Sequence, residues 1–392
     1  MKGPPDAAMI SRCSIPVVII GASLAGSAAA LKLAQQGIPS LLVDKACFPR
    51  RKACGEGLSG RGVAALLEAG VDVRTECRSW APLEGYRIFL GERPFDIEDT
   101  SGMIGVQRAE LDAALISRVR SCRGASVRFG KPVRSIERAG NRYVVRMGDE
   151  RVEAESLVIA DGAGSRSLAH LGFRAAPVRR RRVGSSSSWR VTRGRLSPFV
   201  QTFLGAAGEV YLTPTGTTTM NLSLLGESGF VAQMSDPARL SQWLQERSAL
   251  LGVECQIDAP PIGAGPLNTL RRAAVHEGAL VAGDACESFD PIGGTGMTHA
   301  VLTGCLAADA VTAIFRGGDR DEALEEYRRG QAAAAQEMRG FTRMTSWMLG
   351  SSVGRVLMPL AVSSGVARRV ADAAHGLTPH SGWGRLVRAV GC

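Results

Sequence analysis

The stretch PVVIIGASLAGSAAALKLAQQGIPSLLVD, residues 16–44, decides the fold of this chain. It begins with β-branched residues from Val17 to Ile20, and this run breaks at Gly21. A helix-forming segment follows, and a second apolar run from Ser40 to Val43 ends at Asp44. Strand, glycine turn, helix, strand and acidic residue, in that order, are typical of a dinucleotide-binding βαβ unit, in which the acid accepts a hydrogen bond from a ribose hydroxyl.

The glycine positions of this unit are Gly21, Ser23 and Gly26, so a serine occupies the middle place. Serine is small enough to let a pyrophosphate approach, but it lacks glycine's freedom at positive φ. We expect the start of the helix, with Leu24 and Ala25, to hold phosphates through backbone N–H groups and the helix dipole. The alternative is an ordinary βαβ turn that binds no ligand.

The composition is that of a globular enzyme. The 392 residues allow two domains, or one large domain with an insertion, and 45% of them are apolar while 21% are charged. The net charge of +10 would attract anionic cofactors, nucleic acid or an acidic membrane surface, although an arginine-rich coding bias explains it equally well. Because no aromatic-basic stripe or helix-turn-helix pattern is present, we expect no nucleic-acid partner.

The nine cysteines are scattered, their number is odd, and none are paired at metal-ligand spacing, so we expect no metal site. The first residues, MKGPPDAAMISRCS, lack the apolar core of a signal peptide. A run of about 18 apolar residues that would span a bilayer is also not apparent. These observations predict a cytoplasmic protein with reduced thiols.

The pattern of predicted elements divides the chain into an α/β frame, an inserted antiparallel sheet and a helical tail. The predicted boundaries are 1–79, 99–173 and 271–318 for the frame, 80–98 and 174–270 for the sheet, and 319–392 for the tail. Within the sheet segment, one helix is expected at about 236–250. In the tail we expect helix breaks near Gly350, Gly354 and Pro359. Ligand sites in such folds lie between the parts.

Two further signatures follow the βαβ unit. The first is ADGAGSR at residues 160–166, which comes directly after a buried strand. The second is Gly283-Asp284 at a strand end, followed by DPIGGTGM at residues 290–297, which opens a helix. This last arrangement would place a carboxylate on a ribityl hydroxyl and aim a helix N-terminus at a ring that gains negative charge on reduction.

With these three signatures in this order, the chain resembles the FAD-dependent superfamily of para-hydroxybenzoate hydroxylase, geranylgeranyl reductases and flavin-dependent halogenases. The likeness covers residues 15 to about 316. It implies a Rossmann-like FAD-binding domain of the glutathione reductase type, with an inserted β-sheet substrate domain and FAD in an extended pose. The residues that match the cofactor motifs are Gly21, Ser23, Leu24, Ala25, Gly26, Asp44, Lys45, Arg50, Cys54, Gly55, Arg108, Asp161, Gly162, Gly283, Asp284, Pro291, Gly293, Gly294, Thr295, Gly296 and Met297.

The loop FPRRKACGEGL, residues 48–58, is similar to the Phe-Pro-Arg…Lys…Cys-Gly loop of the geranylgeranyl reductase branch. The segment VYLTP at 210–214 lies where that branch has Tyr-x-Trp-x-Phe-Pro, but its tryptophan and phenylalanine are missing. The halogenase Trp-x-Trp-x-Ile-Pro motif is also missing, which argues against chlorination. Cys54 and Glu56 are the candidate catalytic residues, with a packed thiol and a solvated carboxylate as the alternatives.

We therefore expect an FAD-dependent oxidoreductase. The first reading is an NAD(P)H-dependent monooxygenase of secondary metabolism, which hydroxylates an aromatic or polyketide-like small molecule through a flavin hydroperoxide. The second is a geranylgeranyl reductase-like enzyme that reduces double bonds of a prenyl or lipid-like substrate. A flavin-fold protein that binds lipid without turnover is a third, and the intact Gly283-Asp284 motif argues against it.

Bulky residues of the inserted sheet are expected to face the substrate, although any sheet core needs aromatic residues as well. We name Trp189, Phe203, Tyr211 and Pro214 as substrate residues. His299 is expected to pack rather than to bind. The tail alternates apolar residues with arginines, so its helices either pack on the frame or lie on a membrane surface. The oligomeric state is left open.

Overall fold

The computed structural model describes residues 12–173, 182–267 and 269–369. Its first sheet has the strand order β18 (Val275–His276), β19 (Ala279–Val281), β11 (Glu150–Ile159), β1 (Arg12–Ile20), β2 (Ser40–Asp44) and β8 (Ala125–Phe129). β1 pairs in parallel with both β11 and β2, and the hairpin of β9 (Val133–Ala139) and β10 (Arg142–Met147) extends from β11. The central strands are buried on both faces, which explains their continuous apolar sequences.

The turn after β1 is closed by close backbone contact. Gly21 has a φ of +104°, and a Cβ there would lie 2.3 Å from the carbonyl oxygen of Ala160 at the end of β11. A Cβ on Gly26 would lie 1.8 Å from the carbonyl oxygen of Gly21. Both glycines are therefore required by packing of the turn itself, whatever ligand the turn holds.

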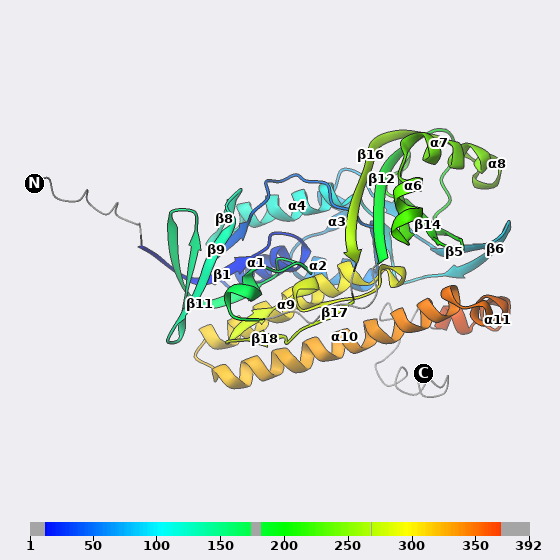
Figure 1. Ribbon diagram of the computed structural model, residues 1–392. Helices are drawn as coiled ribbons and strands as arrows, with labels where there is room; N and C mark the ends of the chain where they lie inside the picture. The colour runs from blue at the N-terminus through cyan, green and yellow to red at the C-terminus, as the bar shows by residue number, and fades with distance from the viewer. Residues whose placement is uncertain (1–11, 174–181, 268, 370–392) are drawn as a thin grey trace, which may run out of the picture.

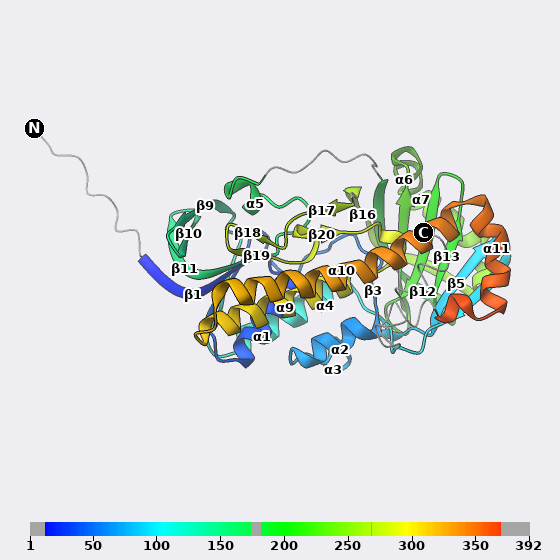
Figure 2. The ribbon, with the colours of Figure 1, turned by 90° about the horizontal axis from the view of Figure 1, so that it is seen from below.

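Helices cover this sheet. α1 (Leu24–Gln35) packs against α9 (Gly296–Phe315), and α10 (Arg320–Gly350) lies across α9 (Figure 2). In the described part of the chain, α9 is the helix that is long and apolar enough to cross a membrane, in contrast to the expectation from sequence. Its apolar composition has another cause: it packs against α1, α2 (Gly60–Glu68) and α10, and a helix enclosed on several sides is apolar all round.

The second sheet has the order β16 (Val253–Leu267), β12 (Arg182–Gly194), β15 (Thr219–Gly226), β14 (Gly208–Pro214), β13 (Phe199–Leu204), β5 (Gly85–Leu90) and β6 (Arg93–Glu98). It is mixed rather than purely antiparallel, because β13 pairs in parallel with β5. Its core contains the rings of Phe89, Phe203 and Trp243, with Phe89 stacked on Phe203 at 4.3 Å between centroids.

The helical tail differs from prediction in one respect. α10 ends at Gly350 as expected, but Gly354 and Pro359 both lie inside α11 (Ser352–Ser363). Pro359 lies in the interior of this helix, which therefore lacks the backbone hydrogen bond that a residue at 359 would donate to the carbonyl of Arg355. α10 runs from the first sheet to the second, and α11 lies beside β6 at the far end of the molecule (Figure 1).

Shorter elements complete the described chain. The predicted helix at 236–250 is divided into α7 (Pro237–Glu246) and α8 (Ser248–Leu251). The others are α3 (Val73–Glu76), α4 (Arg108–Ser121), α5 (Ser167–His170), α6 (Ser228–Met234), β3 (Gly57–Leu58), β4 (Ala81–Pro82), β7 (Ile104–Gly105), β17 (Leu270–Arg271), β20 (Glu287–Ser288), and the 3₁₀ turns η1 (Gly283–Ala285) and η2 (Pro291–Gly293).

Candidate functional site

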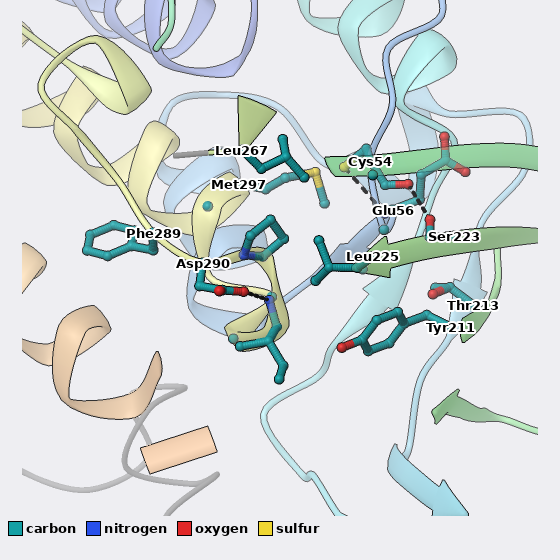
Figure 3. A pocket seen from close by; sticks show the side chains of 18 of the residues that line it. Cys54, Glu56, Tyr211, Thr213, Ser223, Leu225, Leu267, Phe289, Asp290 and Met297 are labelled. Carbon is teal, nitrogen blue, oxygen red and sulfur yellow. Dashed lines mark hydrogen bonds between the residues drawn. The ribbon is translucent and has the colours of Figure 1, made fainter. Parts of the chain in front are cut away.

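A cavity of about 420 Å³ lies where the two sheets and α10 meet (Figure 3). This volume falls in the range of small-molecule sites. Many of the residues predicted from the sequence line it, and they come from all three signatures, the loop and the second sheet: Ser23, Leu24, Ala25, Cys54, Gly55, Glu56, Arg108, Gly162, Tyr211, Gly283, Asp284, Pro291, Gly293, Gly294, Gly296 and Met297. The fold therefore gathers segments that are far apart in the sequence.

Ser23 stands at the start of α1, but its hydroxyl does not cap the helix. Instead its Oγ accepts a hydrogen bond from Arg108 Nη2 at 2.7 Å and lies 3.3–3.4 Å from the carboxylate oxygens of Asp112. The serine in the glycine fingerprint thus has a structural partner. The first backbone N–H groups of α1 are left for a ligand in the cavity.

Arg108 is the buried cation of the site, only 5% exposed. It forms an ion pair with Asp112 one turn later in α4, at 3.1 Å. Its Nη1 lies 3.7 Å from Cys54 Sγ, and its Nε has no hydrogen-bond partner. A buried donor without a partner is costly, so this edge of the guanidinium is suited to an acceptor on a bound ligand.

The loop that carries Cys54 is held against the second sheet. The Cys54 carbonyl accepts hydrogen bonds from Asn221 Nδ2 at 2.9 Å and Ser223 Oγ at 3.0 Å. Its backbone N–H donates to Ser186 Oγ at 3.3 Å. The thiol lies in the cavity wall, where the backbone N–H of Glu56 also approaches it at 3.4 Å (Figure 3). These contacts fix the position of Cys54 from both sides.

Glu56 is half-buried and has a positive φ of +61°, which is unusual for a residue other than glycine. Its carboxylate accepts the backbone N–H of Arg108 at 3.0 Å, at the start of α4. Burial raises the pKa of Glu56 to about 7, against the opposing effects of this hydrogen bond and of the Arg108 charge. Glu56 therefore joins the Cys54 loop to the helix that carries Arg108.

Lys52 and Asp284 complete the charged end of the cavity. Burial lowers the pKa of Lys52 and raises the pKa of Asp284, while the attraction between the two charges opposes both shifts. Lys52 is the lysine of the Phe-Pro-Arg…Lys…Cys-Gly loop, but the sequence did not predict it as a site residue. Its position shows only once the loop folds over η1.

The glycine-rich turn forms the opposite wall. The Asp290 carboxylate accepts the backbone N–H of Ile292 at 3.1 Å, and Gly294 adopts a φ of +63° before α9 begins at Gly296. Asp290 also pairs with Arg182 of β12 at 2.9 Å, and Arg182 contacts Glu209 of β14. This network attaches the turn to the second sheet, so the two walls of the cavity are held together.

The site as described fits the FAD that the sequence predicts. The starts of both α1 and α9 lack a side-chain cap and face or adjoin the cavity, as a pyrophosphate and a flavin ring require. Arg108 Nε and Tyr211 Oη belong to residues of the cavity lining and are buried without partners. Such polar atoms are the contacts that a bound cofactor would satisfy.

Several predicted cofactor residues lie outside the cavity lining. Asp44 accepts the backbone N–H groups of Ala22 and Ala46, both at 2.8 Å, and so closes the βαβ turn. Asp161 accepts the Ser167 backbone and hydroxyl, while its Oδ1 has no partner. The others outside the lining are Gly21, Gly26, Lys45, Arg50 and Thr295.

Three of the four predicted substrate residues are not at the cavity. Trp189 is fully buried, with its Nε1 donating to Ser187 Oγ at 2.9 Å, and Phe203 is stacked in the core of the second sheet. Pro214 lines a separate small hollow. Side chains alternate between the two faces of a strand, and sequence alone does not say which face is the core. His299 is packed as expected, against Phe289, and burial lowers its pKa to about 4.

The apolar end of the cavity was not foreseen. Its wall comes from α10 and α11, through Phe341, Met344, Met348, Leu349 and Met358. The second sheet contributes Ile88, Leu224, Leu225 and Leu267. The apolar residues of the tail predicted packing or membrane contact, but nothing in their spacing indicated which of them would reach a cavity.

Known proteins resemble this chain over most of its length. The family model described as "FAD binding domain" matches residues 14–342. A menaquinone reductase of Mycobacterium tuberculosis is 28% identical, over 76% of each chain. Digeranylgeranylglycerophospholipid reductase 3 of Methanosphaera stadtmanae is 25% identical, over 80% of this chain and 81% of that protein. The solved structure of PqsL, a probable FAD-dependent monooxygenase of Pseudomonas aeruginosa, is 19% identical, with a TM-score of 0.72 over 90% of this chain and all of that chain; it shows the fold alone.

Asp284→Ala should yield protein that purifies with little flavin, because the carboxylate predicted to hold the ribityl chain is lost. The measurement is the flavin absorbance per mole of purified protein. Asp149→Ala, which removes an exposed carboxylate from the turn between β10 and β11, is the matched control and should retain the cofactor. A full flavin content in Asp284→Ala would refute the role of Asp284.

Glu56→Gln should change how stability depends on pH. Because the pKa of Glu56 is raised in the folded state, its contribution to stability is present below about pH 4.5 and is lost as pH rises through about 7. Relative to the wild type, the variant should therefore gain about 2–3 kcal/mol in free energy of unfolding between about pH 5 and pH 8. Urea unfolding measures this, and parallel pH curves for the two proteins would contradict it.

Proposed function

The chain belongs to the FAD binding domain family and is an FAD-dependent oxidoreductase, and on this premise we propose that it reduces carbon–carbon double bonds of a prenyl or similarly lipid-like substrate. The residues that would hold FAD line the cavity: Ser23 and Leu24 at the start of α1, Arg108, Asp284, and Gly296 at the turn that opens α9. NAD(P)H is the proposed reductant. FAD bound by these residues and reduced by NAD(P)H would supply the hydride for the reaction.

The observation that carries the proposal is the apolar end of the cavity. An aromatic ring for hydroxylation needs a compact pocket with polar groups that orient it. Here the cavity continues from the charged residues to a wall of methionine and leucine side chains on α10 and α11. Methionine is flexible and fills irregular space, so this wall suits a long, flexible hydrocarbon chain. The names of the menaquinone and digeranylgeranylglycerophospholipid reductases agree with such a substrate.

Saturation of a double bond requires a hydride at one carbon and a proton at the other. Cys54 is the group proposed to deliver that proton, since its thiol lies in the cavity wall. Glu56 N–H and Arg108 Nη1 both point at Cys54 Sγ, so the S–H hydrogen is not needed for either contact and can be directed at the substrate. After transfer, the same two donors would stabilise the negative charge left on sulfur. Glu56 and Arg108 thus act as positioning residues for Cys54.

Tyr211 is proposed to bind the polar end of the substrate. Its hydroxyl is buried, has no hydrogen-bond partner and lies in the cavity (Figure 3). Burial raises the pKa of Tyr211 well above its ordinary value, so the group remains a hydrogen-bond donor. A quinone or ester carbonyl would satisfy it.

Hydroxylation, the function first predicted from the sequence, consumes O₂, whereas reduction of a double bond does not. The test is turnover of the FAD-loaded enzyme with NADPH or NADH and a long-chain menaquinone, with and without O₂, followed by mass spectrometry. After reoxidation of any quinol in air, double-bond reduction predicts a quinone that retains two added hydrogens in its prenyl chain, located by fragmentation and formed equally well without O₂. A product that has gained an oxygen atom, formed only with O₂, would overturn the proposal in favour of hydroxylation.

Cys54→Ala should lower the rate of double-bond reduction by about 10²-fold or more, the usual effect of losing a group that transfers a proton. Flavin content and the rate of flavin reduction by NAD(P)H should stay near those of the wild type. Cys47→Ala, which removes an exposed thiol close by in the sequence, is the control. An unchanged rate of reduction in Cys54→Ala would show that the proton comes from elsewhere.

A further inference from the structure

We propose that the outer face of α11 docks on an anionic lipid bilayer and brings the apolar end of the cavity to the membrane surface. This proposal rests on the surface of two helices and not on the reaction, so it stands whether the enzyme reduces or hydroxylates its substrate. The four apolar side chains of that face are Val353, Val356, Leu357 and Leu360, which we call the α11 outer stripe.

The α11 outer stripe has helical spacing and is exposed. Its members lie at positions i, i+3, i+4 and i+7, so they share one side of the helix. They are 61%, 75%, 42% and 66% exposed, respectively. Single exposed apolar residues are ordinary on protein surfaces, but a continuous row of this kind marks a contact surface.

The opposite face of α11 is packed against the rest of the protein. This packing fixes the orientation of the helix, with its outer stripe facing solvent. Met358 is fully buried and packs in a cluster with Ile88, Ile292 and Leu349. Ser351 caps the helix by accepting the backbone N–H of Gly354 at 2.9 Å. α11 is therefore apolar on two sides, and only the inner side is covered within the described chain.

The charges around the stripe indicate the kind of surface that covers the outer side. Residues 338–371 include five arginines and no aspartate or glutamate. Of these, Arg343, Arg368 and Arg369 are exposed, and Arg368 pairs with Glu98 at 3.2 Å. Trp347, 41% exposed, lies one helical turn after Arg343. Exposed apolar residues, a tryptophan and a cationic margin match an interfacial helix on anionic lipid.

Docking of α11 on a bilayer would bring the apolar end of the cavity close to lipid. Met344 and Met348 of α10 and Met358 of α11 line its apolar end, so the helices that carry the exposed surface also form the cavity wall. α11 and the C-terminal end of α10 lie at one end of the molecule, away from β9 and β10 (Figures 1 and 2). A hydrocarbon substrate dissolved in the bilayer would then reach the cavity without crossing water.

A second copy of this chain would also offer apolar side chains to cover the α11 outer stripe. Pairing two outer stripes would bring two sets of arginines together with no acidic residue in the same segment to oppose them. Like charges brought close together disfavour that contact. A negatively charged bilayer has the opposite effect, because it attracts each arginine near its surface.

The test is co-sedimentation of the full-length, FAD-loaded protein with phosphatidylglycerol–phosphatidylcholine vesicles and with pure phosphatidylcholine vesicles. We expect binding to the anionic vesicles that weakens with added salt. The double variant Val356→Asp, Leu360→Asp should bind them about tenfold more weakly or worse. Its flavin content, and its activity on substrate dispersed in detergent, should stay unchanged, since neither side chain lines the cavity.

Leu67→Asp is the matched control, because Leu67 is an apolar residue of α2 that is 57% exposed. It should leave vesicle binding intact. Wild-type protein that fails to sediment with anionic vesicles would overturn the proposal, as would a double variant that binds like the wild type. A double variant that only abolishes a dimer, seen by analytical ultracentrifugation, would assign the surface to self-association instead.

Discussion

The site depends on one buried cation. Arg108 contacts Ser23 at the start of α1, pairs with Asp112 in its own helix and points at Cys54 Sγ, while its backbone N–H is held by Glu56. A buried charge is stable only with such partners, and its removal would leave Asp112 as an unpaired buried carboxylate. One guanidinium therefore fixes the relative positions of the cofactor-binding helix and the Cys54 loop.

A second network performs the corresponding task on the other wall. Arg182 joins the second sheet to Asp290, which in turn caps the turn that opens α9. The space between the two networks is charged at one end and apolar at the other. Polar cofactor and apolar substrate can therefore occupy the same cavity without competing for the same side chains. The second sheet lacks the tryptophan and phenylalanine of the reductase motif. Their absence does not argue against an apolar substrate, because α10 and α11 supply an apolar wall from outside the sheet.

Residue types and spacing predicted a large part of the fold. The β1–α1–β2 unit and the start of α9 lie close to their predicted positions, since each has an apolar pattern and a glycine turn that marks its start. The pairing of β13 with β5 was not predictable, because it joins strands more than 100 residues apart. Trp189 and Phe203, predicted to face the substrate, lie in the core of the second sheet, because the inner face of a strand is defined by its neighbours.

The sequence by itself determined that this chain is a flavin-dependent oxidoreductase. Tight turns need glycine, and phosphate sites need helix starts, so these constraints stay visible in the linear order of residues. Only the tertiary structure decided the shape of the cavity and the partners of Ser23, Lys52 and Cys54. Those depend on contacts between segments that are distant in the chain, and a side chain's surroundings follow from such contacts rather than from its position in the sequence.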